Sequence, residues 1–300
     1  MQYALPLTDG DSLPLSKKNM RRACKVMHLI WIDPARPGAS LPSRYLENKE
    51  SWKRHNPGAN VWIWTEKDVV SLIAREFPEF ENVYLRLVTP IQKADLARLL
   101  ILYEHGGTYV DCDVLCKKPV CFLNCNEKEN IERCGGDDHD DNHEEPGIVY
   151  NGETRDIWLV RSPLFSEVYQ NCLMTSCFVR DPFWRDVAER VRFNMERIDQ
   201  HSNSATFWWK HHIAGYVLRV IYTTQLTGPA CIDRVLAEKS VYHARIGTFG
   251  SDYYQGDVLW HAESGEWCPF LSPRVLWHLL LSLIRAKFIS VVFHSSLTIF

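Results

Sequence analysis

The segment 89–113 constrains the fold more than any other part of the sequence. Thr89 can cap a helix, Gly106-Gly107 can end one, and the residues between them are apolar on nearly every face. These features predict a buried helix over 89–107. A strand is expected directly after it, at Thr108–Asp111, and this strand runs into an Asp-Cys-Asp sequence. A buried helix that passes without a linker into a strand is typical of a helix-covered sheet.

Short apolar runs alternate with helical patterns upstream of this segment. Strands are predicted at 26–32 and 61–64, because both runs are continuously apolar and of strand length. Helices are predicted at 44–55 and 65–76, the second opened by a capping box. This order of strands and helices implies an α/β fold whose central sheet is mostly parallel and flanked by helices.

The second half of the chain predicts further strands and helices joined by turns. We expect strands at 148–150, 157–161, 240–243 and 257–261, helices at 182–198 and 213–224, and turns at Asn151-Gly152 and Thr227-Gly228-Pro229. Together with the first half they form one predicted domain over residues 25–270.

Three segments differ in composition from this domain. Residues 1–24 are polar and carry a basic cluster, which fits either a solvated arm or contact with anionic lipid head groups. Residues 124–147 are rich in acidic side chains and predict a mobile acidic loop. The tail 271–300 has no acidic residue and fits either a helix docked on the core or one lying in a membrane surface. Its uncharged stretches are shorter than the ~20 residues that span a bilayer.

The composition excludes several classes of protein. Hydrophobic residues make up 46% and charged residues 24% of the 300 residues, so the chain is neither wholly disordered nor a polytopic membrane protein. A net charge of −3 provides no positive field to hold nucleic acid. The start lacks the apolar stretch of a signal peptide, and the ten cysteines have no repeated spacing. We therefore expect reduced thiols and a location that is cytoplasmic or peripheral on a membrane.

Asp111 and Asp113 carry the clearest chemical signal. At positions i and i+2 of a strand their carboxylates point to the same face and repel each other. A cation makes both ionised forms stable, and oxygen ligands at a strand end suit Mg²⁺ or Mn²⁺. Such an ion holds a diphosphate and neutralises it as it leaves. The alternative is a solvated turn with two acids.

Asp95 and Arg98 lie three residues apart, on one face of the predicted buried helix. A charged pair in a buried helix is costly unless it is satisfied. Either the two side chains satisfy each other, or the helix delivers them to the same pocket as Asp111, where they bind sugar hydroxyls.

The stretch 90–113 as a whole resembles the sugar-binding Asp-x-Asp region of family 32 glycosyltransferases. It reads Pro-Ile-Gln-Lys-Ala-Asp-Leu-Ala-Arg and then Gly-Gly-Thr-Tyr-Val-Asp-Cys-Asp. This family includes initiating and inositol-phosphoceramide mannosyltransferases and capsule enzymes, and the core of glucosylating bacterial toxins is similar. The likeness extends upstream to 28–32 and 56–64, and in outline over 165–268. It implies a GT-A-like nucleotide-sugar-binding fold, Mn²⁺ or Mg²⁺, and retaining transfer of a hexose to a hydroxyl of a glycan or glycolipid.

The resemblance also implies roles for individual residues. Trp31 would stack on the nucleobase, and Asp95 and Arg98 would bind the donor sugar. Ser264 and Trp267 would close over the diphosphate. The residues implied in donor binding are Trp31, Ile30, Tyr109, Asp95, Arg98, Asp111 and Ser264. Those implied in catalysis are Asp95, Arg98, Asp111, Asp113 and Trp267. The metal ligands implied are Asp113 directly, Asp111 through water, and His261.

Two other functions fit parts of the sequence. An Asp-x-Asp after a strand is also typical of haloacid-dehalogenase-type phosphatases, in which the first Asp is a nucleophile. That motif normally ends the first strand of its domain, whereas two predicted strands precede Asp111. The second alternative is a relative that binds glycans without turnover. No residue of the motif set has decayed, so transfer is favoured.

Overall fold

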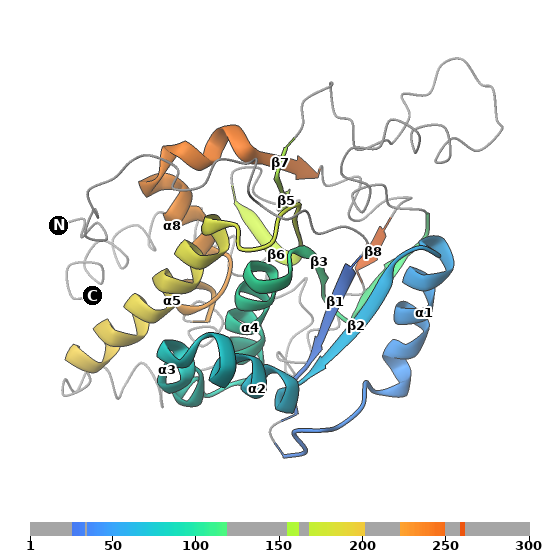
Figure 1. Cartoon of the computed structure of the whole chain (residues 1–300), viewed down its shortest axis with the longest axis horizontal. Coiled ribbons are helices and arrows are strands. Elements are labelled where there is room, and N and C mark those ends of the chain that lie inside the picture. Colours follow the sequence, from blue (N-terminus) through green and yellow to red (C-terminus); the bar gives the residue numbers. More distant parts are fainter. Residues whose placement is uncertain are drawn as a thin grey trace, which may run out of the picture.

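The structure of the protein is a computed structural model (Figure 1). It describes residues 26–33, 35–118, 155–161, 168–201, 223–249 and 259–261, with the backbone alone for 198–201 and 259–261. The predicted N-terminal extension, the acidic loop and the C-terminal tail all lie outside these residues. Within the described ranges, no helix is both long and apolar enough to cross a membrane.

Six strands form the central sheet among the described residues. In spatial order they are β2 (Asn60–Thr65), β1 (Val26–Trp31), β3 (Gly107–Val110), β6 (Tyr169–Ser176), β5 (Ile157–Arg161) and β7 (Ile246–Phe249). β1 pairs in parallel with β2 and β3, and β5 pairs in parallel with β7. β6 is antiparallel to both β3 and β5. The mostly parallel sheet expected from the sequence is therefore confirmed.

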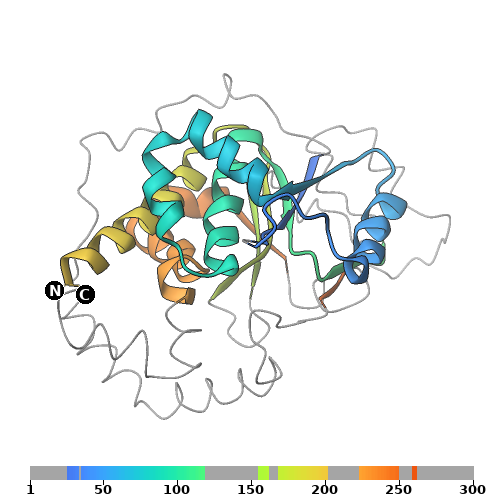
Figure 2. The same ribbon diagram turned by 90° about the horizontal axis from the view of Figure 1, so that it is seen from below.

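Helices cover both faces of this sheet. They are α1 (Leu46–His55), α2 (Glu66–Glu76), α3 (Glu81–Arg86), α4 (Pro90–His105), α5 (Pro182–His201) and α8 (Ala230–Glu238). Figures 1 and 2 show α2 to α5 and α8 on one side of the sheet and α1 on the other. Beside α1, β4 (Val114–Cys116) and β8 (Leu259–His261) form a small antiparallel sheet.

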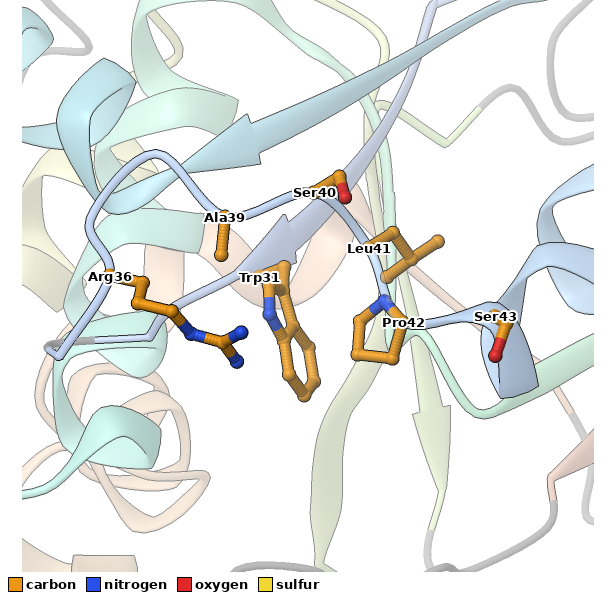
Figure 3. A pocket seen from close by; sticks show the side chains of 7 residues that line it. All are labelled: Trp31, Arg36, Ala39, Ser40, Leu41, Pro42 and Ser43. Atoms are coloured by element: carbon orange, nitrogen blue, oxygen red, sulfur yellow. The ribbon is translucent and has the colours of Figure 1, made fainter.

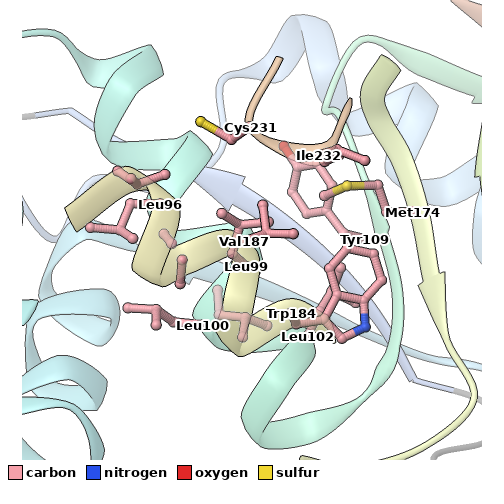
Figure 4. Packing of buried hydrophobic residues seen from close by; sticks show 14 of the residues in the cluster. Leu96, Leu99, Leu100, Leu102, Tyr109, Met174, Trp184, Val187, Cys231 and Ile232 are labelled. Carbon is pink, nitrogen blue, oxygen red and sulfur yellow. The ribbon is translucent and has the colours of Figure 1, made fainter. Parts of the chain in front are cut away.

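Each face of the sheet has its own apolar core. Alternate residues of β1 point to opposite faces, so Met27 and Leu29 pack in the core that contains Trp52 of α1. Ile30 packs in the larger core, which the helices on the other face share. In that core α4 lies between α5 and the sheet (Figure 4). Its position between two layers explains why apolar residues occupy nearly every face of α4.

Helix α4 has the ends that the sequence predicts. The Gln92 N–H donates to Thr89 Oγ1 at 3.3 Å, and the Thr89 N–H donates to Gln92 Oε1 at 3.3 Å. At the other end Gly106 and Gly107 have φ values of +60° and +80°. A Cβ on Gly107 would lie 2.5 Å from the carbonyl oxygen of Val26, so a side chain there would push β3 away from β1. The two glycines thus fix where β3 begins.

The predicted strand at 240–243 is wrong, because these residues belong to the 3₁₀ helix Ser240–Arg245. The Tyr242 N–H donates to the Lys239 carbonyl at 3.2 Å, and the buried Tyr242 side chain bonds to Asp186. The position beside β5 is occupied by β7, which begins at Ile246. Local hydrogen bonds of the 3₁₀ helix therefore replace the bonds to a neighbouring strand that the prediction required.

The other predicted elements agree with the structure or fall outside it. The strand at 157–161 is β5, the helix begun at Pro182 is α5, and the strand near His261 is β8. The strand at 148–150, the Asn151-Gly152 turn and most of the helix at 213–224 lie outside the described residues.

Candidate active site

The Asp-Cys-Asp sequence lies in a turn at the carboxyl end of β3. The strand ends at Val110, and the Val114 N–H donates to the Asp111 carbonyl at 3.1 Å. The expectation that Asp111 and Asp113 share one face of a strand is therefore wrong. The ladder with β6 makes its last bond from the Asp111 N–H to the Cys172 carbonyl, at 2.8 Å, and the chain then crosses to β4. The motif remains at the sheet edge where α/β folds bind ligands.

Helix α1 holds this turn in place. Three of its side chains bond to the backbone of residues 112–116. They are Asn48 Nδ2 with the Cys112 carbonyl, Trp52 Nε1 with the Val114 carbonyl, and Ser51 Oγ with the Cys116 N–H, each at 2.9 Å. The position of the two carboxylates is thus fixed by a helix that lies more than sixty residues upstream.

Arg98 lies between Asp95 and Asp111. Its guanidinium nitrogens are 3.2 Å from Asp95 Oδ1 and 3.4 Å from Asp111 Oδ1. It also donates to the carbonyls of Ala94 and Asn171, at 3.2 and 2.6 Å. The sequence left open whether Asp95 and Arg98 satisfy each other or meet Asp111. In the structure Arg98 contacts both aspartates.

Tyr109 supports this cluster from the sheet. The Arg98 guanidinium carbon lies 4.5 Å from the centre of the Tyr109 ring, and the Tyr109 hydroxyl donates to Asp111 Oδ1. Arg98 and Tyr109 are almost fully buried, whereas the Asp111 side chain is 26% exposed. Asp111 is therefore the member of the cluster that a ligand can reach most directly.

Asp95 is buried with a hydrogen-bond donor on each carboxylate oxygen. Thr227 Oγ1 donates to Oδ2 at 2.8 Å, and Asn171 Nδ2 donates to Oδ1 at 2.9 Å. Burial raises the pKa of Asp95 to about 6, and the Arg98 charge and these hydrogen bonds oppose the rise. Burial by itself would lower the pKa of Arg98, but Tyr109 and the two aspartates raise it. Above pH 6 the cluster thus holds an ionised Asp95 and a cationic Arg98.

Trp31 ends β1 at the same sheet edge and lines a hollow of about 460 Å³ (Figure 3). The loop 36–43 supplies the rest of the wall. Tyr45 lies against the indole with ring centres 5.6 Å apart. The neighbouring Ile30 is buried in the core, and its carbonyl accepts a hydrogen bond from the Cys112 thiol at 3.3 Å. A flat aromatic wall beside polar loop residues suits a planar heterocycle.

The backbone of His261 lies next to the turn that carries the two aspartates. In the β4–β8 pair it lies opposite Val114, the residue after Asp113. Ser264 and Trp267 lie outside the described residues. Among the side chains that the structure describes, no group of three or more His, Cys, Asp or Glu residues could hold a metal ion.

Comparison with known proteins identifies the region around this turn. Residues 42–132 match the family model described as a glycosyltransferase sugar-binding region containing a DXD motif, which is Asp111-Cys112-Asp113 in this chain. Residues 42–132 are thus similar to a glycosyltransferase sugar-binding region. The resemblance stated from the sequence is therefore confirmed for this region, and its curated relatives are named glycosyltransferases.

Two of these relatives are mannosyltransferases. The chain is 31% identical over 121 residues to the inositol phosphoceramide mannosyltransferase 1 of Schizosaccharomyces pombe, a match that covers 39% of this chain and 36% of the relative. It is 34% identical over 123 residues to the initiation-specific alpha-1,6-mannosyltransferase of Candida albicans, which covers 40% of this chain and 29% of the relative. The matches thus span about a third of the length of these relatives.

Solved structures of similar shape include the UDP-bound glycosyltransferase domain from the YGT toxin. Its TM-score is 0.46 at 13% sequence identity, over 76% of this chain and 80% of that domain. The α/β class expected from the sequence, with a helix-covered and mostly parallel sheet, agrees with the strand order described above.

The structure brings together four of the predicted site residues, Asp95, Arg98, Tyr109 and Asp111. Side chains that were not predicted to belong to the site also contact this cluster or the turn beside it. Sequence reasoning gave no role to Asn48, Asn171 or Thr227. Asn171 and Thr227 lie in the downstream segment that resembles the family in outline, which was a usable signal. For Asn48 the sequence offered none.

Proposed function

We propose that the protein is a metal-dependent, retaining glycosyltransferase that moves a hexose from a nucleotide-diphosphate sugar to a hydroxyl of a glycan or glycolipid. The observation that carries this proposal is Arg98 held between Asp95 and Asp111 inside the sugar-binding region. A rigid guanidinium flanked by carboxylates offers both donors and acceptors, which is what a sugar with several hydroxyl groups requires.

The donor occupies the carboxyl edge of the sheet in this proposal. Its base stacks on Trp31 in the hollow beside loop 36–43, and its sugar lies over Arg98 and the half-buried Asp111. Tyr109 lies beneath and fixes Asp111 rather than contacting the sugar. The mannosyltransferase relatives favour GDP-mannose as the donor, and a UDP-hexose is the alternative.

The residues of the turn fit a divalent cation. Mg²⁺ and Mn²⁺ sites commonly use one or two carboxylates together with substrate phosphates, so a protein cage of three ligands is not required. Asp113 would bind the ion directly, Asp111 through water because Arg98 and Tyr109 already hold its Oδ1, and His261 would be a further ligand. When bound, the ion neutralises the negative charge that develops on the departing diphosphate.

The names of the relatives support a glycan or glycolipid as the acceptor. One of them is named for transfer to inositol phosphoceramide, a glycolipid, and another for initiation of an alpha-1,6-mannose linkage. A glycolipid acceptor lies in a membrane, so contact of the tail 271–300 with a membrane surface is part of this proposal. Ser264 and Trp267 remain proposed partners of the diphosphate.

The proposal predicts a metal-dependent response to nucleotide sugars. UDP- and GDP-sugars are screened by thermal shift with and without Mn²⁺, and the correct donor raises the unfolding temperature by several degrees only when Mn²⁺ is present. Asp113→Ala should then lower metal-dependent transfer or donor hydrolysis by at least about 100-fold, with little change in unfolding temperature. Glu81→Ala, which removes an exposed carboxylate on α3, is the matched control and should behave as the wild type.

Other outcomes point elsewhere. Full activity of Asp113→Ala would refute the metal assignment. Turnover of a generic aryl phosphate with Mg²⁺ would favour the phosphatase, and metal-independent glycan binding without a response to any nucleotide sugar would favour a non-catalytic relative.

A further inference from the structure

The Thr227 hydroxyl connects a distant turn to the candidate active site. Thr227 is 2% exposed, and its Oγ1 lies 2.8 Å from Asp95 Oδ2 although the two residues are 132 positions apart. The same hydroxyl is 3.3 Å from the Thr223 carbonyl. A hydroxyl has one proton to donate, and an ionised carboxylate at the shorter distance is the stronger acceptor.

The turn that carries Thr227 is held by contacts that do not involve this hydroxyl. The N–H groups of Thr227 and Gly228 both donate to the Thr223 carbonyl at 3.0 Å. From α5, Asn194 Nδ2 donates to the carbonyls of Gln225 and Leu226, at 3.2 and 3.1 Å. The backbone position of Thr227 is thus set independently, which makes its hydroxyl a fixed point against which Asp95 is held.

The other oxygen of Asp95 is held from the sheet. Asn171 on β6 donates to Oδ1 at 2.9 Å, and its own carbonyl accepts a hydrogen bond from Arg98 at 2.6 Å. Asp95 is 3% exposed, with donors on both oxygens and Arg98 at 3.2 Å. Both oxygens of Asp95 are therefore already occupied by partners from the protein.

We propose that Thr227 is a positioning residue for sugar transfer. Together with Asn171 it fixes the Asp95 carboxylate, which in turn holds the Arg98 guanidinium over Tyr109 and against Asp111. The inference rests on the proposed function, because it concerns how the donor sugar is held. Loss of the hydroxyl leaves Asp95 with one oxygen unbonded in a buried site, so Arg98 loses its fixed geometry.

The test compares two hydroxyl deletions in the same turn. Thr227→Val should lower kcat/KM for the donor by about tenfold or more, since a hydrogen bond to a buried charged group is lost. Thr227→Ser keeps the hydroxyl and should retain activity within about twofold of the wild type. Thr223→Val is the matched control, because the Thr223 hydroxyl accepts from Gln92 at 3.3 Å and does not touch Asp95. Its transfer activity should be unchanged.

A double-mutant cycle separates positioning from general weakening of the fold. If Thr227 acts through Asp95, Thr227→Val should cause no further loss in an Asp95→Asn background. Wild-type activity of Thr227→Val, or a loss that adds fully to that of Asp95→Asn, would overturn the inference while the proposed function stands. A wild-type protein inactive with every nucleotide sugar would overturn the proposed function, and this inference with it.

Discussion

Two buried arginines, each between two aspartates, lie at opposite edges of the sheet. Arg98 sits between Asp95 and Asp111 at the carboxyl end of β3. Arg245 lies just before β7, where it contacts Asp156 at 2.8 Å and forks onto both oxygens of Asp181. Because β3, β5 and β7 point the same way, the Arg245 cluster occupies the amino edge of the sheet.

The two clusters differ in how completely they are closed. All three members of the Arg245 cluster are at least 94% buried, with Asp181 fully so. In the Arg98 cluster the arginine and Asp95 are buried as deeply, but Asp111 exposes 26% of its side chain. The Arg245 cluster joins the starts of β5, α5 and β7, and no carboxylate in it faces outward. The same combination of one arginine and two aspartates is thus fully enclosed at one edge, where it links three elements, and partly open to solvent at the other.

The sharpest test of this comparison replaces each arginine by lysine. A lysine cannot reproduce the planar fork, so both variants should lose about 1–3 kcal/mol in free energy of unfolding. Arg98→Lys should also lower the transfer kcat by at least about 100-fold, whereas Arg245→Lys should leave kcat per folded molecule unchanged. Urea unfolding and transfer assays on the same preparations check both statements. A kcat that falls equally in the two variants would remove the distinction between the edges.

The features predicted correctly from sequence are those encoded within a few residues. The capping box at Thr89, the glycine pair at Gly106-Gly107 and the apolar faces of α4 each depend on neighbours along the chain. The prediction that Asp111 and Asp113 lie on one face of a strand was wrong because β3 ends at Val110. Where β3 ends depends on its pairing with β6, which begins more than fifty residues later. Local pattern cannot show where a distant partner strand stops.

Only those residues of the candidate site that are close together in the sequence could be predicted. Asp95, Arg98, Tyr109 and Asp111 lie within seventeen consecutive residues, so one helix and one strand place them together. Asn171 and Thr227 lie 76 and 132 positions from Asp95, and only tertiary packing brings them to it. The Arg245 cluster has the same property, since its members are 64 and 89 positions from Arg245.

The next test uses the pH dependence of stability. Burial raises the pKa of Asp95 to about 6 from about 3.9 in the unfolded chain. The folded protein therefore favours the protonated form of Asp95. The free energy of unfolding should fall by about 3 kcal/mol as the pH rises from below 4 through 6 and Asp95 becomes ionised. Asp95→Asn should remove this loss, so the wild-type and variant unfolding free energies diverge between pH 4 and 6. Parallel curves would show that Asp95 is not held as described.

The amino edge supplies the comparison for this experiment. Burial also raises the pKa of Asp181. Asp181→Asn should therefore likewise reduce the loss of unfolding free energy that accompanies a rise from acidic to neutral pH. The two variants should differ in activity. The wild-type kcat should fall below about pH 6, because protonation of Asp95 removes one of the two carboxylate charges beside Arg98. Asp181→Asn should show the same fall in kcat at acidic pH.

The smallest expected effect concerns the turn that holds the two carboxylates. Asn48→Ala removes the 2.9 Å hydrogen bond to the Cys112 carbonyl and should cost about 1 kcal/mol of stability. It should also raise the Mn²⁺ concentration needed for half-maximal transfer by about tenfold, because Asp111 and Asp113 then occupy a looser turn. Titration of activity with Mn²⁺ measures this directly.

Ser176→Ala is the matched change at the other edge. Ser176 Oγ donates to the Phe178 carbonyl at 2.8 Å, where β6 pairs with the first residues of β3 and β5. Its loss should cost a similar ~1 kcal/mol and leave the Mn²⁺ requirement unchanged. If both variants shift the Mn²⁺ titration alike, the shift reports general loosening of the sheet. If only Asn48→Ala shifts the Mn²⁺ titration, metal binding depends on the hydrogen bond that supports the turn at the carboxyl edge and not on a bond of similar strength elsewhere in the sheet.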